Sequence, residues 1–410
     1  MNVTRRDFLL SCGAAAASFP AFSLKLAYSA PPSNTSNTPL LLHVFLRGGM
    51  DGLQLIAPLT DPYYIAARPQ PLRVNAHGKA FVLDNAYGEE AFFINPRATA
   101  LHQLYQQGYL AVIHACGLTH ETRSHFEASD MIERGTHNKM EKSGWLSRLF
   151  NLLQTNGPQE ALAMGNGVPT SLLGCSHLLP LVDQWSLDWP SSKTTMDFLR
   201  AAYDHYPLLG EAALNALDVS SQMAASVLRD SNQQIIIPEP PRNINYGEHS
   251  FGQGLKFLAH MVQRNPLVNM ANIELDGWDT HEQQSDHFGN LLETLSQGVR
   301  AFFQQMNSQQ RNVLIVVHSE FGRRLKANES GGTDHGHGNV MLVIGQQIKG
   351  GRCYGAWPGL ATEQLSQQAD LQVTTDYRHV LASLLPAYGL AVNAPLFPDF
   401  SARALPLLRQ

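Results

Sequence analysis

Five nearly continuous apolar runs are the feature that most constrains the fold of this 410-residue chain. They are LLLHVFL at 40–46, LAVIHAC at 110–116, MANIEL at 270–275, NVLIVVHS at 312–319 and NVMLVIG at 339–345. Strands of this kind are covered on both faces, as in parallel sheets. Between them lie helical patterns, one beginning near Ser285 and one running from a cap at Thr375 to a stop before Gly389. This alternation predicts an α/β three-layer sandwich with a mostly parallel central sheet.

The N-terminal segment has the pattern of an export signal. TRRDFLL, a paired-arginine region, is followed by the weakly apolar SCGAAAASFPAFSL, as in twin-arginine signals. We predict a signal at 1–30, a polar linker at 31–39, and a single domain at 40–410 with a helical insertion around 180–250. The twin-arginine export machinery would then be a partner, and the mature protein would be periplasmic or secreted.

Charge and apolar content exclude two classes of protein. The net charge is −5, and no run of Lys or Arg is long enough to follow a phosphate backbone, so we expect no nucleic-acid partner. After the signal, no stretch approaches the ~18–20 apolar residues of a membrane span, so we expect no transmembrane anchor in the mature chain. Once Cys12 is removed, three cysteines at wide spacing allow at most one disulfide and indicate no thiolate metal site.

Polar side chains follow the ends of several predicted strands. In α/β folds, ligands bind beyond the carboxyl ends of the strands, so residues there are expected to converge. The residues at this edge are Asp51; Asp276, Asp279 and His281; Glu320, Arg323 and Arg324; and Asp334, His335 and His337 within GGTDHGHGN, which precedes the last strand. This convergence of carboxylates and imidazoles from four segments predicts a metal site.

Each part of this set has a structural alternative. Asp51 in GGMDGL could be a ligand or could end the strand in a turn. Asp279 and His281 form a D-x-H pair, a short separation common for two ligands of one ion. Glu320 could be a ligand or could favour a helix start near Arg323. The segment 331–339 could be a solvated loop, but two histidines separated by one glycine and preceded by Asp favour metal binding.

Ser124 also has two interpretations. It precedes a predicted helix after the run at 110–116, and with Glu127 it fits the S-x-x-E capping box. A hydroxyl at a helix N-terminus could also be a nucleophile, because the helix end favours a developing anion. Both roles stay open at this point.

A set of ordered motifs resembles a known family. RGGMDGL, TRSHFEASD, LDGWDTH, SEFGRR and GTDHGHG, followed by GGRCYGAWPGL and TTDYRHV, resemble the DUF1501 family of exported bacterial proteins, which is similar to the alkaline phosphatase and sulfatase superfamily. The resemblance covers nearly the whole mature chain. It implies an alkaline phosphatase-like sandwich that holds two divalent metals.

The resemblance also implies roles for particular residues. Asp51 matches the Asp after the first strand, and Ser124 or Thr122 falls at the position of the nucleophile. Asp279 and His281 resemble an Asp-His pair of one metal, with His335 or His337 as its last ligand.

The chain departs from the superfamily pattern at one place. Where the pattern has Asp-His-Gly after a strand, this sequence has Glu320 and Phe321. Asp334 and His335 could supply that pair instead, although a loop separates them from the strand. We therefore expect one or two divalent ions, with zinc or manganese favoured by the nitrogen ligands.

The function implied by the resemblance is metal-dependent hydrolysis of phosphate or sulfate esters. A metal-activated Ser124 hydroxyl would be the nucleophile, and Arg123 or Arg323 would clamp the remaining oxygens of the substrate. The substrate would be an anionic small molecule or a cell-envelope component. The alternative is a non-catalytic, exported, metal-stabilised binding protein on the same scaffold.

Overall fold

The computed structural model describes residues 38–87, 90–154, 159–182, 193–204, 210–232 and 234–409. The predicted signal at 1–30 and most of the linker lie outside these residues, so both stay predictions. None of the helices in the described ranges combines the length and the apolar content that spanning a membrane would require.

A nine-stranded sheet forms the centre of the protein, and β1 lies in its middle. β1 pairs in parallel with β10 and β11, and β6 and β7 extend the β10 side. On the other side β12 is antiparallel to both β11 and β5, while β13 and β14 are parallel to β5. The strands are β1 (Leu40–Leu46), β5 (Leu110–Gly117), β6 (Glu160–Met164), β7 (Leu178–Leu181), β10 (Val268–Leu275), β11 (Val313–Ser319), β12 (Asn339–Gly345), β13 (Arg352–Tyr354) and β14 (Thr375–Asp376). All five predicted strands are therefore confirmed.

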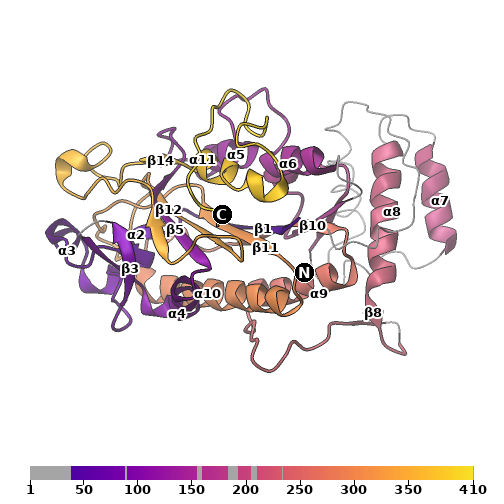
Figure 1. The fold of residues 1–410 in the computed structure, drawn as a ribbon, viewed down its shortest axis with the longest axis horizontal. Helices are drawn as coiled ribbons and strands as arrows, with labels where there is room; N and C mark the ends of the chain where they lie inside the picture. Colours follow the sequence, from indigo (N-terminus) through magenta and orange to yellow (C-terminus); the bar gives the residue numbers. More distant parts are fainter. Residues whose placement is uncertain are drawn as a thin grey trace.

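Helices cover both faces of this sheet (Figure 1). One face carries α4 (Thr99–Gln106), α9 (Ser250–Arg264) and α10 (Gln284–Ser308), and the other carries α5 (His125–Arg134), α6 (Trp145–Leu153) and α11 (Tyr377–Ala382). The side chains of β1 alternate between two separate apolar cores, because successive residues of a strand point to opposite faces. The predicted three-layer sandwich with a mostly parallel sheet is thus confirmed.

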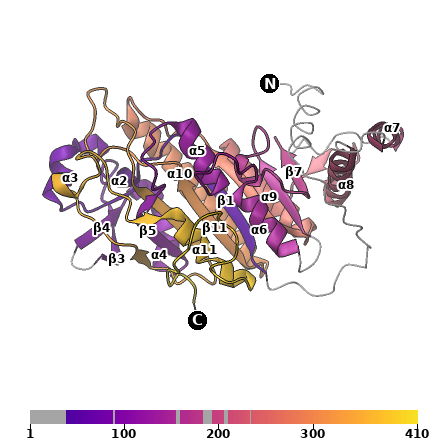
Figure 2. The same cartoon turned by 90° about the horizontal axis from the view of Figure 1, so that it is seen from above.

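Smaller elements extend the sandwich at both ends (Figure 2). One end holds α2 (Gly52–Leu55), α3 (Pro62–Ala67) and a small sheet of β2 (Ile56–Ala57), β4 (Glu90–Ile94) and β3 (Phe81–Tyr87). The other end holds α7 (Lys193–Asp204) and α8 (Gly210–Ser226), with the β8 (Leu228–Arg229) and β9 (Ile235–Ile236) pair following. These last elements occupy the stretch predicted to be an insertion, whose status as a domain feature stays a prediction.

The start of the last helix differs from the prediction by one residue. Asp376, not Thr375, caps α11, because its carboxylate accepts a hydrogen bond from the backbone N–H of Arg378 at 2.9 Å. Thr375 instead extends β14 and pairs with Cys116. A short 3₁₀ turn, Leu385–Tyr388, then ends at Gly389 in the left-handed region, as the sequence predicts.

Candidate metal centre

Three imidazoles and one carboxylate converge beyond the carboxyl ends of the parallel strands. The ligand atoms of His125, Asp279 and His335 all lie within 4.8 Å of one another. Nε2 of His335 is 2.9 Å from Nε2 of His125 and 2.9 Å from Nε2 of His281. Oδ1 of Asp279 is 3.0 Å from Nε2 of His281, 3.1 Å from that of His335 and 3.4 Å from that of His125.

These four side chains come from three segments that follow the ends of three strands. His125 is the first residue of α5, which follows β5, and Asp279 and His281 lie on the loop after β10. His335 lies on the connection from β11 to β12. That connection is packed closely: a Cβ at Gly336 would lie 2.4 Å from the backbone of Arg323, and one at Gly332 would lie 2.4 Å from that of His281. The glycines of GGTDHGHGN therefore allow the loop to bring His335 inward.

The outer nitrogen of each imidazole faces a group that can only accept a hydrogen bond. The pairs are His125 Nδ1 with Glu320 Oε1 at 2.7 Å, His281 Nδ1 with Asp334 Oδ1 at 3.2 Å, and His335 Nδ1 with the carbonyl oxygen of Arg123 at 2.8 Å. A neutral imidazole that donates from Nδ1 presents a lone pair at Nε2. All three Nε2 lone pairs then point toward one carboxylate oxygen.

This arrangement fits a divalent cation. Lone pairs and a carboxylate oxygen that meet at 2.9 to 3.4 Å repel one another unless a positive charge lies between them. Metal-bound histidines donate their other ring N–H to a carboxylate or a carbonyl, as these three do. A set of three nitrogens and one carboxylate oxygen suits zinc, and manganese as the second choice. The chain thus contains the donor set and the orienting groups of one ion site.

The carboxylates of the centre are kept ionised by their neighbours. Burial opposes ionisation of Asp279, but the hydrogen bond and the positive charge of Arg323 outweigh it and lower the pKa of Asp279 to about 2. Burial likewise opposes ionisation of Glu320, and the hydrogen bond with His125 contributes most to a pKa below the usual range. That same hydrogen bond raises the pKa of His125, so protons and a metal compete for this ring.

The two arginines predicted to clamp a substrate are occupied by the protein. The buried guanidinium of Arg323 donates to Asp279 at 2.6 Å, and its other donors go to the backbone carbonyls of Gly48, Gly49, Trp278 and Thr333. The Arg123 side chain pairs with the buried carboxylate of Asp370 and donates to Gln367. All three nitrogens of Arg323 and two of the three of Arg123 thus have partners within the protein, and the clamp role stays a prediction.

Asp51 is not part of the centre. It is buried and forms a bidentate ion pair with the equally buried Arg68, with distances of 2.5 and 3.0 Å, and it accepts a third hydrogen bond from Gln284. The structure thus places the Asp51 oxygens where they compensate a buried arginine, and the role of Asp51 as a metal ligand stays a prediction.

His337 points away from the centre, whereas its neighbours contribute to it. Nε2 of His337 lies 2.9 Å from the carbonyl oxygen of Leu118, and its Nδ1 is buried without a hydrogen-bond partner among the described residues. Of the two histidines in the motif, His335 reaches the other ligands. Asp334 and Glu320, predicted as ligands, lie behind them as acceptors for His281 and His125.

Ser124 caps α5, as one of the two interpretations predicts. Its hydroxyl accepts from the N–H of Glu127 at 3.5 Å, and its side chain is exposed. The second half of the predicted capping box differs: the Glu127 carboxylate accepts from the hydroxyl of Thr122 at 2.8 Å, and the N–H of Ser124 donates to Thr122.

His125 is the ligand that the sequence analysis missed. It follows Ser124 directly and becomes the first residue of the helix. The pattern of this segment is that of a helix cap, and the signal for His125 is its place at the same sheet edge as the other imidazoles. The departure at Phe321 also has an explanation here, because its ring packs 4.7 Å from that of His125 and 5.0 Å from that of His335, measured between centroids.

Fold and site together define an α/β protein with a histidine-rich cluster at the carboxyl edge of its sheet that could hold a metal ion. Residues 111–386 match the family described as "Protein of unknown function (DUF1501)", and the chain belongs to this family. No curated protein matches the chain.

Several solved structures are similar at low sequence identity. The periplasmic domain of EcEptC from Escherichia coli, in complex with Zn, is 10% identical with a TM-score of 0.38, over 90% of this chain and 89% of that chain. The soluble domain of lipooligosaccharide phosphoethanolamine transferase A from Neisseria meningitidis is 10% identical with a TM-score of 0.39, over 90% and 92%. An alkaline phosphatase superfamily protein from Vibrio parahaemolyticus is 9% identical with a TM-score of 0.36, over 95% and 76%.

Proposed function

We propose that the protein is an exported, metal-dependent hydrolase of phosphate or sulfate esters. The observation that carries this proposal is the convergence of three imidazole Nε2 atoms on Oδ1 of Asp279, with every Nδ1 held by an acceptor. A divalent ion supplies two things when bound: it lowers the pKa of a nearby hydroxyl and it neutralises anionic oxygens of a substrate.

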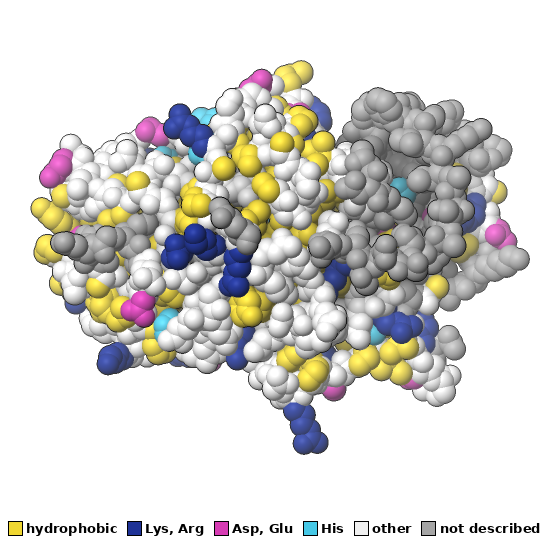
Figure 3. All heavy atoms as spheres, in the orientation of Figure 1, with side chains coloured by type: hydrophobic (Ala, Val, Ile, Leu, Met, Phe, Trp, Pro, Cys, Tyr) yellow, Lys and Arg dark blue, Asp and Glu magenta, His cyan; other side chains and the backbone are white. Residues whose placement is uncertain are grey.

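The residues of this site would have two roles, one group as metal ligands and the other as groups that orient the ligands. His125, His281, His335 and Asp279 would hold the ion, while Glu320, Asp334 and the Arg123 carbonyl fix the rings in position. The site is open to solvent, since the side chain of Asp279 is 49% exposed and that of His281 is 40% exposed. Figure 3 shows Lys and Arg side chains at several places on one face of the described residues. At the site itself, the ion would be a concentrated positive charge for an anionic ester.

Ser124 is the hydroxyl that we assign to attack. It immediately precedes His125 at the N-terminus of α5, where the unpaired N–H groups of the first turn favour an anionic oxygen. Its hydrogen bond with the N–H of Glu127 is long at 3.5 Å. Breaking this bond when a substrate binds would therefore cost little free energy.

The test uses two substitutions at this position. The zinc- or manganese-loaded protein should hydrolyse p-nitrophenyl phosphate, bis(p-nitrophenyl) phosphate or p-nitrophenyl sulfate. Ser124→Ala removes both hydroxyl and cap, whereas Ser124→Asp keeps a capping side chain without a hydroxyl. Both should lose turnover by about 100-fold or more with unchanged metal content. Ser129→Ala, on the same helix, is the control.

Two results would refute the proposal. One is a loaded wild-type protein that turns over none of the three esters, and the other is a Ser124→Ala variant that keeps the wild-type rate.

One observation favours the alternative of a non-catalytic, metal-stabilised binding protein. Arg323 directs all three of its nitrogens, and Arg123 two of its three, to partners within the protein, which leaves few donors for substrate oxygens. A binding protein would keep its affinity for an anionic ester in Ser124→Ala and would show no turnover before or after the change.

A further inference from the structure

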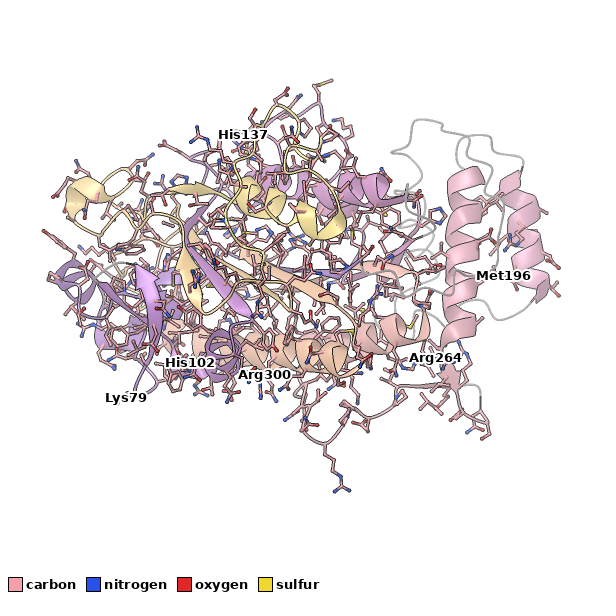
Figure 4. All side chains as sticks on the ribbon, in the orientation of Figure 1. Lys79, His102, His137, Met196, Arg264 and Arg300 are labelled. Carbon is pink, nitrogen blue, oxygen red and sulfur yellow. The ribbon has the colours of Figure 1, made fainter. Side chains whose placement is uncertain are left out.

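Two adjoining hollows lie far from the metal centre. They have volumes of about 570 and 330 Å³, and Pro241 and Ser308 line both of them. The extended segment 238–244 forms one wall, and the C-terminal turns of α9 and α10 form the other. Figure 4 labels Arg264, the last residue of α9, which lines the smaller hollow. α10 begins next to the metal centre, and its 25 residues span about 37 Å, so the hollows form a separate site.

The larger hollow is lined by neutral side chains. Amide and hydroxyl groups come from the turn before β5, the segment 241–244 and the end of α10, namely Gln107, Asn243, Gln304, Asn307 and Ser308. Among the described residues, its lining contains no carboxylate, amine or guanidinium. A charged ligand would lose hydration there without gaining an opposite charge, whereas amides and hydroxyls both donate and accept hydrogen bonds. The lining therefore selects an uncharged ligand with many polar groups.

An aromatic ring on the same wall is held in place from two directions. The Tyr109 ring packs 5.0 Å from the Phe303 ring, and the guanidinium carbon of Arg409 lies 5.8 Å from its centre. Tyr109 is half-buried and lines the hollow. A fixed aromatic surface accepts a flat apolar face of a ligand at a low entropic cost. The ligand should thus carry C–H groups on one face and polar groups around its edge.

The smaller hollow contains an unpaired polar atom. His260 is 3% exposed, lines this hollow, and its Nε2 has no hydrogen-bond partner among the described residues. Buried polar atoms are nearly always paired, so an orphaned imidazole nitrogen beside an open hollow points to a missing partner. Three charged side chains also line this hollow: Lys256 and Glu239 pair at 2.7 Å, and Arg264 is the third.

We propose that the two hollows bind consecutive residues of a neutral oligosaccharide. A sugar ring has a C–H face for Tyr109 and hydroxyl groups around its edge for the amides. A hydroxyl of the next residue reaches Nε2 of His260, which it satisfies as donor or acceptor. Since Pro241 and Ser308 line both hollows, one continuous chain can fill them. This site does not depend on the proposed hydrolase activity.

The experiment is calorimetric titration of the full chain with maltotriose, cellotriose and triacetylchitotriose. At least one should bind with a Kd of about 1 mM or below. Tyr109→Ala and His260→Phe should each weaken binding by about tenfold or more. Asn307→Ala, at an exposed position, keeps the test valid if the His260 variant does not fold. Tyr63→Ala, an exposed tyrosine on α3, is the matched control and should bind as the wild type does.

Three outcomes would overturn the proposal. They are binding of none of the three sugars at millimolar concentration, equal binding by wild type, Tyr109→Ala and Asn307→Ala, and binding of trigalacturonate but of no neutral trisaccharide.

Discussion

Glu320 offers the sharpest test of how the metal centre is built. Its Oε1 accepts from Nδ1 of His125 at 2.7 Å and from the N–H of Gly48 at 2.9 Å, while Oε2 accepts from Ser319. Glu320→Gln keeps an acceptor for His125 and removes the charge. Glu320→Ala also frees the ring to rotate. Loss of such an outer partner costs about 10- to 100-fold in metal affinity, or about 1.4 to 2.7 kcal/mol. We expect a loss of metal affinity of about 10-fold for Glu320→Gln and of about 100-fold for Glu320→Ala.

The assay is competition for Zn²⁺ between the apoprotein and a chromophoric chelator at fixed pH. Glu293→Gln is the control, because that carboxylate is exposed on α10 and pairs only with Arg97 among the described residues, at 2.6 Å. If both Glu320 variants bind Zn²⁺ within twofold of the wild type, the outer acceptors do not determine the orientation of the imidazoles. The reasoning from Nδ1 partners to Nε2 lone pairs would then be refuted.

Three further predictions follow from other contacts. Asp51→Asn leaves the buried Arg68 charge unpaired, so urea unfolding should show a loss of about 3–5 kcal/mol with unchanged Zn²⁺ affinity; weaker Zn²⁺ binding would return Asp51 to the ligand set. His337→Ala should bind Zn²⁺ as the wild type does, whereas His335→Ala should lose most of the bound Zn²⁺ in elemental analysis. Equal losses in the two variants would contradict the assignment of His335, and not His337, to the metal centre. Burial, with repulsion from Glu274, raises the pKa of Glu133 from 4.5 to about 7 despite an opposing arginine. The native state therefore retains a proton that the unfolded chain releases, and the free energy of unfolding should fall by about 3 kcal/mol as pH rises from 4.5 to 7. Glu133→Gln should remove this contribution in urea titrations at several pH values, and an unchanged pH slope would count against it.

The sequence was most informative where local pattern and topology coincide. Apolar runs defined the central strands, because burial on both faces leaves few polar positions. The rule that strand ends meet at one edge then brought Asp279, His281 and His335 together correctly, without any knowledge of their contacts.

The contacts of the site region that the sequence did not predict join residues far apart in the chain. Nothing local shows that Arg68 would be buried against Asp51, or that Arg323 would bind four backbone carbonyls from three loops. Which imidazole of DHGH turns inward depends on glycine contacts with other loops, so His335 and His337 could not be separated beforehand. His125 was not predicted for a different reason: it lies in a segment whose local pattern is that of a helix cap.

The position of β1 at the centre of the sheet has a consequence for the time at which the protein can fold. β1 leaves the ribosome early, yet its register partner for Leu46 is Ser319, 273 residues later. At about 5–20 residues per second, that partner is synthesised roughly 14 to 55 s after β1. Until then β1, which is buried along its whole length, has no native neighbour on that side. We therefore expect the sandwich to form only near the end of synthesis, and nascent chains stalled before β11 to remain dependent on chaperones.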